Sequence, residues 1–180
     1  MRPTRFALAL VRILAARGLR LSTAESLTGG LIGAAITSIP GSSRVYWGGF
    51  VTYDVAAKES SLGVSRDLVE RHGVVSREVA EAMASGAASR SGADISVAVT
   101  GVAGPGGAEP NAPVGTVWIA VAISSEGRPL AVVSASRSFR GSRARVRDLT
   151  VRAAVDMVAE VAQREFPERD RPNGDSAHGA

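Results

Sequence analysis

Cysteine is absent from the 180-residue sequence, and histidine occurs only as His72 and His178. The lack of cysteine excludes disulfides, a thiol nucleophile and a thiolate metal site. With two histidines, a histidine-based metal site is not expected either. A magnesium ion held by carboxylates stays open, although no motif points to one. We therefore expect neither a metal nor a cofactor.

Lysine is almost absent as well, because Lys58 is the only lysine among 21 basic residues. A lysine can lose its proton in a buried site, whereas an arginine effectively cannot. Lys58 is therefore a candidate for a task that arginine could not perform, such as that of a general base. The alternative is that one lysine remains by chance in a composition biased toward arginine.

Long apolar runs and aromatic residues are also scarce. No run approaches the length of a transmembrane helix, and aromatic residues make up 4% of the chain. The first 17 residues have the basic start of a signal peptide, but Arg12 interrupts the apolar stretch and no cleavage site follows. We expect a cytoplasmic protein with no membrane partner and a core of aliphatic side chains.

Positive charge prevails, with a net charge of +4 and a pI of about 10.5. Such a balance can indicate nucleic-acid binding. Here the arginines are spread along the chain, and the one dense segment, Arg137 to Arg152, alternates with apolar residues as an amphipathic helix does. No aromatic residues interleave with it as stacking platforms. Nucleic acid is not expected as the main partner.

Hydrophobic periodicity and capping residues predict an alternation of helices and strands. Its order, α β α β α α α β β β α, predicts a three-layer α/β/α sandwich with a mixed central sheet. We expect one domain over residues 1–166 and a disordered polar tail over 167–180. The predicted helices are Thr4–Arg17, Gly30–Ser38, one after Asp54 that ends at Gly63, one from Ser65 to Arg71, Ser76–Ser91 and Arg143–Arg164; the predicted strands are Leu19–Thr23, Val45–Tyr53, Ile95–Thr100, Gly115–Ser124 and Leu130–Phe139.

The stretch from Thr23 to Gly30 joins the first predicted strand to the second helix. A helix that begins there points free backbone N–H groups at whatever occupies the turn. Ser26 in such a turn is placed to act as a nucleophile or to bind an anion. A helix N-cap is the simpler interpretation, since serine before an apolar run is typical of a cap.

Three further polar residues stand at or just after predicted strand ends. Tyr53 ends the second strand, Lys58 follows it by one or two turns, and Thr100 ends the third strand before a glycine-rich loop. In open α/β sheets, ligands bind outside the carboxyl ends of the strands. If these strands are parallel neighbours, the three residues and Ser26 should meet at one edge. Each also has a purely structural interpretation. Ser26 would then be a helix cap and Tyr53 a core ring, while Lys58 would lie on the surface of a helix and Thr100 would simply end a strand.

Six sequence blocks in this order resemble the CinA C-terminal domain family. The first is Thr-Ala-Glu-Ser-Leu-Thr-Gly-Gly over 23–30, and the others are Pro-Gly-Ser-Ser (40–43), Gly-Phe-Val-Thr-Tyr (49–53) with Lys58, His-Gly-Val-Val-Ser (72–76), Thr-Gly-Val-Ala-Gly-Pro (100–105) and Pro-Val-Gly-Thr-Val-Trp (113–118). The resemblance covers nearly everything from Gly18 to about Ala154. The chain is too short for the molybdopterin-binding-like domain that precedes this one in longer members, so it resembles the stand-alone form.

The resemblance implies a homo-oligomeric nicotinamide-nucleotide amidase of pyridine nucleotide salvage. Its reaction would convert nicotinamide mononucleotide (NMN) into nicotinic acid mononucleotide and ammonia. Ser26 would be the nucleophile and Lys58 its general base, helped by Tyr53. The resemblance also implies an oxyanion site formed by the backbone donors of Thr28, Gly29 and Gly30 together with Ser43. Thr100 and the loop containing Gly101 and Gly104 would line the nucleotide site, and Arg143 would contact the phosphate.

The residue chemistry agrees with that mechanism, because a chain without cysteine has few nucleophile–base pairs, and Ser with a neutral Lys is one of them. Two alternatives stay open. The same pocket in a non-catalytic module would bind a nucleotide without hydrolysing it. A DNA-associated role, in line with the competence-linked name of the family, would show as a steep salt dependence of DNA binding.

Overall fold

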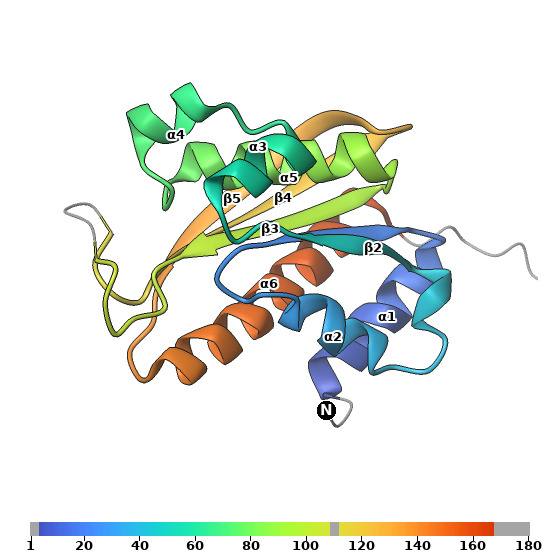
Figure 1. The fold of residues 1–180 in the computed structure, drawn as a ribbon. Helices are drawn as coiled ribbons and strands as arrows, with labels where there is room; N and C mark the ends of the chain where they lie inside the picture. Colours follow the sequence, from blue (N-terminus) through green and yellow to red (C-terminus); the bar gives the residue numbers. More distant parts are fainter. Residues whose placement is uncertain (1–3, 109–111, 168–180) are drawn as a thin grey trace, which may run out of the picture.

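The computed structural model describes residues 4–108 and 112–167, so the predicted disordered tail lies, beyond Pro167, outside the described residues. The elements follow the predicted order (Figure 1). The helices are α1 (Arg5–Arg17), α2 (Leu31–Thr37), α3 (Val55–Leu62), α4 (Arg66–His72), α5 (Arg77–Ser91) and α6 (Arg143–Glu165), with a 3-10 turn η1 (Ser42–Arg44); the strands are β1 (Leu21–Glu25), β2 (Tyr46–Val51), β3 (Ile95–Gly101), β4 (Thr116–Ser125) and β5 (Arg128–Ser138).

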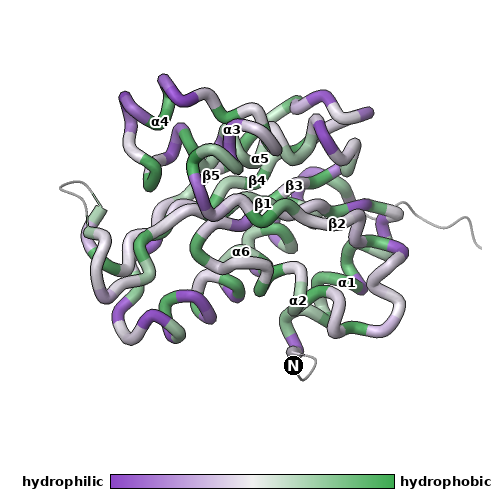
Figure 2. Tube along the Cα trace, viewed as in Figure 1, coloured by the Kyte–Doolittle hydropathy of each residue, from purple (hydrophilic) through white to green (hydrophobic). Residues whose placement is uncertain are grey.

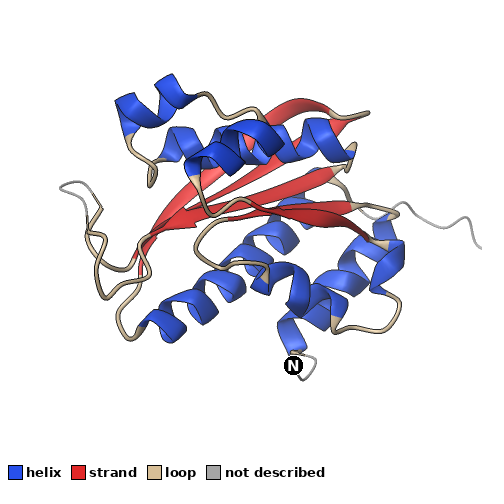
Figure 3. Cartoon of the chain, viewed as in Figure 1, coloured by secondary structure: helices blue, strands red, loops and turns tan. Residues whose placement is uncertain are grey.

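The five strands form one mixed sheet in the order β2-β1-β3-β4-β5. Strand β1 is parallel to both of its neighbours, whereas β4 is antiparallel to β3 and to β5. Helices cover both faces, with α3, α4 and α5 on one side and α1, α2 and α6 on the other (Figures 1 and 3). This is the predicted three-layer α/β/α sandwich.

The two faces of the sheet carry side chains of different size. Bulky aliphatic residues of β1, β3 and β4, such as Leu21, Ile95 and Ile119, pack against α1, α2 and α6. Alanines of the same strands, such as Ala24, Ala98 and Ala120, face α5, which is itself rich in alanine. Small residues on both surfaces let α5 approach the sheet closely. Strands β3 and β4 are mostly apolar along their length (Figure 2).

Four helices begin where the capping residues predict. The side chains of Asp54, Ser65, Ser76 and Ser142 accept hydrogen bonds from backbone N–H groups two or three residues further on, at the starts of α3, α4, α5 and α6. Strand β1 begins and ends two residues later than predicted. It therefore includes Glu25, which is almost fully buried.

The glycine pair Gly48-Gly49 in β2 marks both a bulge and a close approach of two strands. The register of β1 against β2 shifts so that Leu21 faces Tyr46 and Ser22 faces Gly48. A Cβ at Gly49 would lie 2.1 Å from Thr23 Oγ1, which only glycine avoids.

Among the described residues, no helix is long and apolar enough to cross a membrane.

Candidate active site

The carboxyl ends of the three parallel strands meet at one edge of the sheet. Glu25 at the end of β1 pairs with Val51 of β2 and Val99 of β3. Ser26 follows directly, and its backbone N–H donates to the carbonyl of Val99 at 3.1 Å. The expectation that the strands bearing Ser26, Tyr53 and Thr100 are parallel neighbours is thus confirmed.

Ser26 and Lys58 form a close pair. The Nζ of Lys58 lies 3.1 Å from Ser26 Oγ and donates to the carbonyls of Thr52 at 2.7 Å and Tyr53 at 3.3 Å. A neutral amine has two hydrogens, so these two carbonyls can take both and leave the nitrogen lone pair facing the serine hydroxyl. An ammonium group would have one hydrogen for each of the three acceptors. The same geometry therefore suits both protonation states.

Lys58 is fully buried on α3, and Ser26 is 7% exposed. Burial lowers the pKa of Lys58 from its usual value to about 8, because the charged ammonium loses its hydration. The carboxylate of Asp54, the N-cap of α3, acts in the opposite direction and raises the pKa. A lysine with a pKa near 8 is neutral in a useful fraction of molecules at neutral pH.

Glu25 binds most of the free donors at the start of α2. Its carboxylate accepts from the backbone N–H groups of Gly30 (3.0 Å), Ile32 (3.0 Å) and Gly33 (2.9 Å). The N–H of Gly29 donates to the Ser26 carbonyl at 3.1 Å. The prediction that Gly29 and Gly30 N–H groups hold an oxyanion therefore does not fit this structure, because both are already used. Sequence reasoning missed this role of Glu25.

Two donors of the turn are left over. Among the described residues, the backbone N–H groups of Leu27 and Thr28 donate to no acceptor. Leu27 lines the cavity beside Ser26, and Thr28 is buried with its carbonyl accepting from Arg147 Nη2 at 2.8 Å. The donor next to the serine in sequence is thus Leu27 rather than a glycine. Arg147, which holds this turn onto α6, was also missed, although it lies one helical turn after Arg143.

Replacing Glu25 with alanine is expected to lower the free energy of unfolding by about 3 kcal/mol. The change removes a buried acceptor and leaves three helix-start N–H groups without a partner. Urea unfolding at pH 7 measures the loss. Glu25→Gln keeps one acceptor oxygen and should lose less, so equal stability of wild type and both variants would contradict the assigned hydrogen bonds.

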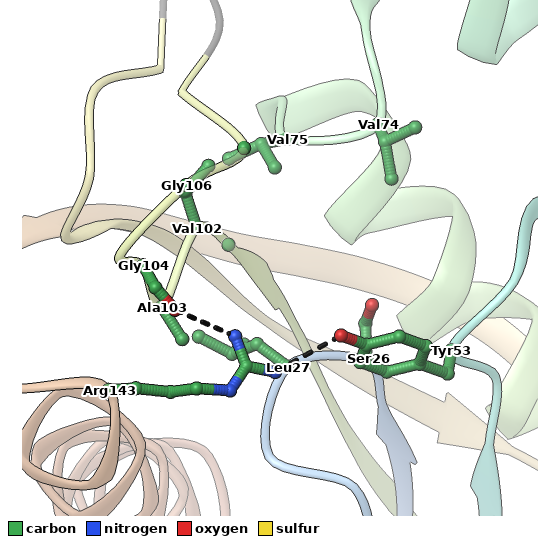
Figure 4. Close-up of a pocket in the computed structure, with 12 residues that line it drawn as sticks. Ser26, Leu27, Tyr53, Val74, Val75, Val102, Ala103, Gly104, Gly106 and Arg143 are labelled. Atoms are coloured by element: carbon green, nitrogen blue, oxygen red, sulfur yellow. Dashed lines mark hydrogen bonds between the residues drawn. The ribbon is translucent and has the colours of Figure 1, made fainter.

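A cavity of about 300 Å³ opens beside Ser26. Figure 4 shows apolar side chains around it, including Val74, Val75 and Val102, with Arg143 reaching in from α6. The lining residues are Ser26, Leu27, Tyr53, Val74, Val75, Gly101, Val102, Ala103, Gly104, Gly106, Gly107 and Arg143. An apolar wall with a few polar groups is the usual composition of a small-molecule site. Sequence reasoning named Ser26, Tyr53, Arg143 and the loop from Gly101 to Gly106, but not Val74 and Val75.

Arg143 bridges two walls of this cavity. Its guanidinium donates to the carbonyl of Gly104 at 3.0 Å and to the hydroxyl of Tyr53 at 3.1 Å (Figure 4). The Tyr53 side chain is 64% exposed, and its hydroxyl bond goes to Arg143, not to Lys58. The expected help from Tyr53 to the base is therefore limited to its backbone carbonyl, which accepts from Lys58.

Thr100 and Ser43 lie elsewhere than expected. Thr100 is fully buried, and its Oγ1 donates to the carbonyl of Val74 at 2.9 Å, so it supports the cavity wall from behind. Ser43 is exposed on η1, which precedes β2 and therefore lies at the amino end of the parallel strands. Within one chain, a strand length separates Ser43 from Ser26. The implied contribution of Ser43 to the oxyanion site does not fit this placement.

No group of three or more histidine, cysteine or carboxylate side chains lies close enough to hold a metal ion in the described part of the chain. The side chains at this edge of the sheet offer a hydroxyl, a buried amine of lowered pKa and a guanidinium.

Similarity to known proteins agrees with the fold. A CinA-like protein from Chlorobium luteolum is 54% identical over 113 residues, 63% of this chain and 26% of that protein. The chain spans about a quarter of the length of the first curated relatives that it matches. A nicotinamide-nucleotide amidohydrolase PncC from Pseudomonas putida is 50% identical over 137 residues, 76% of this chain and 82% of that protein.

Solved structures give the same result. The competence/damage inducible protein CihA of Agrobacterium tumefaciens superimposes with a TM-score of 0.82 at 41% identity, over 91% of this chain and 99% of that one. The sequence model of the CinA C-terminal domain matches residues 4–162, nearly the whole of the described chain. The chain belongs to the CinA C-terminal domain family.

Proposed function

We propose that this protein hydrolyses the carboxamide of nicotinamide mononucleotide, giving nicotinic acid mononucleotide and ammonia, in pyridine nucleotide salvage. The observation that carries the proposal is the 3.1 Å contact between Ser26 Oγ and the buried amine of Lys58 at the wall of the cavity. The amidohydrolase from Pseudomonas putida supports the choice of substrate.

In the proposed mechanism, neutral Lys58 takes the proton of the Ser26 hydroxyl as the oxygen attacks the carboxamide carbon. The carbonyl oxygen becomes an oxyanion, and the N–H groups of Leu27 and Thr28, which have no acceptor among the described residues, are the donors of the turn that would stabilise it. The Lys58 ammonium then protonates the leaving nitrogen, and ammonia departs. An acyl ester on Ser26 remains.

Water completes the reaction. Lys58, neutral again, takes a proton from a water molecule that attacks the ester, and the Ser26 oxygen recovers that proton as the acid leaves. Arg143 would bind the phosphate of the nucleotide, since a guanidinium pairs well with phosphate and this one extends into the cavity. The valines of the wall would contact the pyridine ring.

The decisive experiment is an ammonia-release assay with the purified protein and a panel of pyridine carboxamides: NMN, nicotinamide riboside, NAD and nicotinamide. We expect the largest kcat/KM with NMN. Binding of NMN without release of ammonia would instead support the non-catalytic nucleotide-binding alternative.

The pH dependence should follow the state of Lys58. Because the base acts when neutral, kcat/KM should rise about tenfold per pH unit below pH 8 and level off above it. Asp54→Asn keeps a capping side chain but removes the carboxylate that raises the pKa of Lys58. This variant should move the rising limb to lower pH; a shift to higher pH would contradict the assignment.

A chelator is expected to leave activity unchanged, because every step above uses a side chain or water. The check is ammonia release after extended incubation with EDTA, compared with an untreated sample. Strong inhibition that added magnesium reverses would point to a metal-activated water in place of Ser26.

A further inference from the structure

Five arginines lie close together in sequence at the end of β5 and the start of α6: Arg137, Arg140, Arg143, Arg145 and Arg147. None of them forms an ion pair with a carboxylate of the residues that the structure describes. Arg143 and Arg147 hydrogen-bond to the cavity wall and to the Ser26 turn. The other three are exposed and line no part of the cavity.

These three arginines stand at the edge of the sheet that carries the cavity. Strands β3 and β5 are both antiparallel to β4, so β5 ends at the edge where β3 ends. The N–H of Phe139 donates to the carbonyl of Gly115, whose own N–H donates to Val102 in the cavity wall. In Figure 2, hydrophilic positions gather at the start of α6, beside the loop that follows β3.

Three of the five arginines stand on α6 and are unfavourable for the start of that helix. A helix N-terminus carries a partial positive charge and is stabilised by acidic residues in its first turn. The first turn of α6 has no acidic residue, and arginines occupy positions 143, 145 and 147. Helix stability therefore does not account for this charge. It adds to the positive potential of the helix start, at the rim of the cavity.

We infer that Arg137, Arg140 and Arg145 form an anion-collecting surface, which draws phosphate-bearing small molecules toward the cavity and selects them over uncharged carboxamides. A cleft flanked by charge of one sign raises the local concentration and the association rate of an oppositely charged ligand. The inference rests on the proposed function for its substrate. It assigns selection by charge to residues that touch neither the reacting amide nor the cavity.

A small anion fits this surface better than a nucleic acid does. A duplex needs a long basic stripe along one face. Here the cluster lies at one sheet edge, whereas Arg20, Arg44 and Arg128 are at the other, next to the amino ends of β1, β2 and β5. The two groups are separated by the length of the strands, about 15–35 Å at 3.3 Å per residue.

The test compares two triple variants that remove three positive charges each, leaving +1 of the +4 net charge. The first is Arg137→Gln, Arg140→Gln, Arg145→Gln. The matched control is Arg20→Gln, Arg44→Gln, Arg128→Gln. These three arginines are exposed, lie at the opposite edge of the sheet and form no ion pair among the described residues. Each variant is assayed with NMN and with nicotinamide riboside, which lacks the phosphate. The assays are run at about 0.02 M NaCl, where charges are weakly screened, and at about 0.5 M NaCl, where they are strongly screened.

We expect the first variant to lose about tenfold in kcat/KM for NMN at low salt, with kcat unchanged. The loss should vanish at high salt and be absent with nicotinamide riboside. The control should match wild type throughout. A general structural fault would instead lower kcat and affect both substrates at both salt concentrations.

Two results would overturn the inference while leaving the proposed function intact. One is equal kcat/KM for NMN in the two variants at low salt. The other is a first variant that keeps the wild-type kcat/KM for NMN but, unlike the control variant, loses binding to duplex DNA. If wild type released no ammonia from any carboxamide, the proposed function would fail. Calorimetric Kd values for NMN would then decide the inference, which requires weaker, salt-dependent binding in the first variant only.

Discussion

Replacing Lys58 with arginine is expected to lower kcat for ammonia release by at least about a thousandfold. Arginine stays charged at any pH at which the protein is folded, so it cannot take the proton of Ser26. It would also place a larger group in a fully buried position. Steady-state kinetics on the purified variant, with NMN as substrate, gives the measurement.

Because arginine at this position could disturb the fold, Lys58→Met serves as the second variant. Methionine is similar in length, carries no charge to bury and lacks the amine. It should still fold, as judged by circular dichroism and urea unfolding, and lose activity to the same extent. If either variant kept activity within tenfold of wild type, Lys58 would not be the base.

Replacing Ser26 with alanine is expected to lower kcat by at least about ten-thousandfold, while the Kd for NMN changes little. The oxygen that would form the acyl ester is removed, but Arg143 and the apolar wall are untouched. Rates come from ammonia release and Kd from calorimetry. Unchanged binding with lost turnover separates an attacking serine from one that only holds the ligand.

The matched control is Ser43→Ala. It removes a hydroxyl from an exposed serine at the opposite edge of the sheet, far from the cavity within one chain. We expect kcat and KM within about twofold of wild type. A large loss in Ser43→Ala would contradict that placement, and turnover by Ser26→Ala would remove Ser26 as the nucleophile.

Much of the fold was predictable because local signals and tertiary structure agree. Ser65, Ser76 and Ser142 predict helix starts, and each caps its helix in the structure. The β-branched run from Ile95 predicts a buried strand, which is the central β3. The pairing of Ser26 with Lys58 was proposed from a lone lysine and a resemblance, and the parallel order of β2, β1 and β3 brings the two side chains into contact.

The remaining details depend on contacts that the sequence does not encode locally. Glu25 lies next to Ser26, yet only the path of the turn sends its carboxylate to the start of α2, where it takes the donor that Gly30 was expected to offer. Thr100 was expected in the pocket because it ends a strand, but its hydroxyl points to Val74. Ser43 resembles a site residue by sequence block, whereas the topology places it at the other edge.

The central claim is that Ser26 attacks the amide and carries the acyl group. Its most direct test is rapid acid quench of the protein during turnover of NMN, followed by mass spectrometry of the peptide containing Ser26. We predict that this peptide carries a covalent nicotinate mononucleotide acyl adduct during turnover and that the adduct is absent in Ser26→Ala. Full turnover with no adduct on Ser26 at any quench time, or an adduct that persists in Ser26→Ala, would contradict the account.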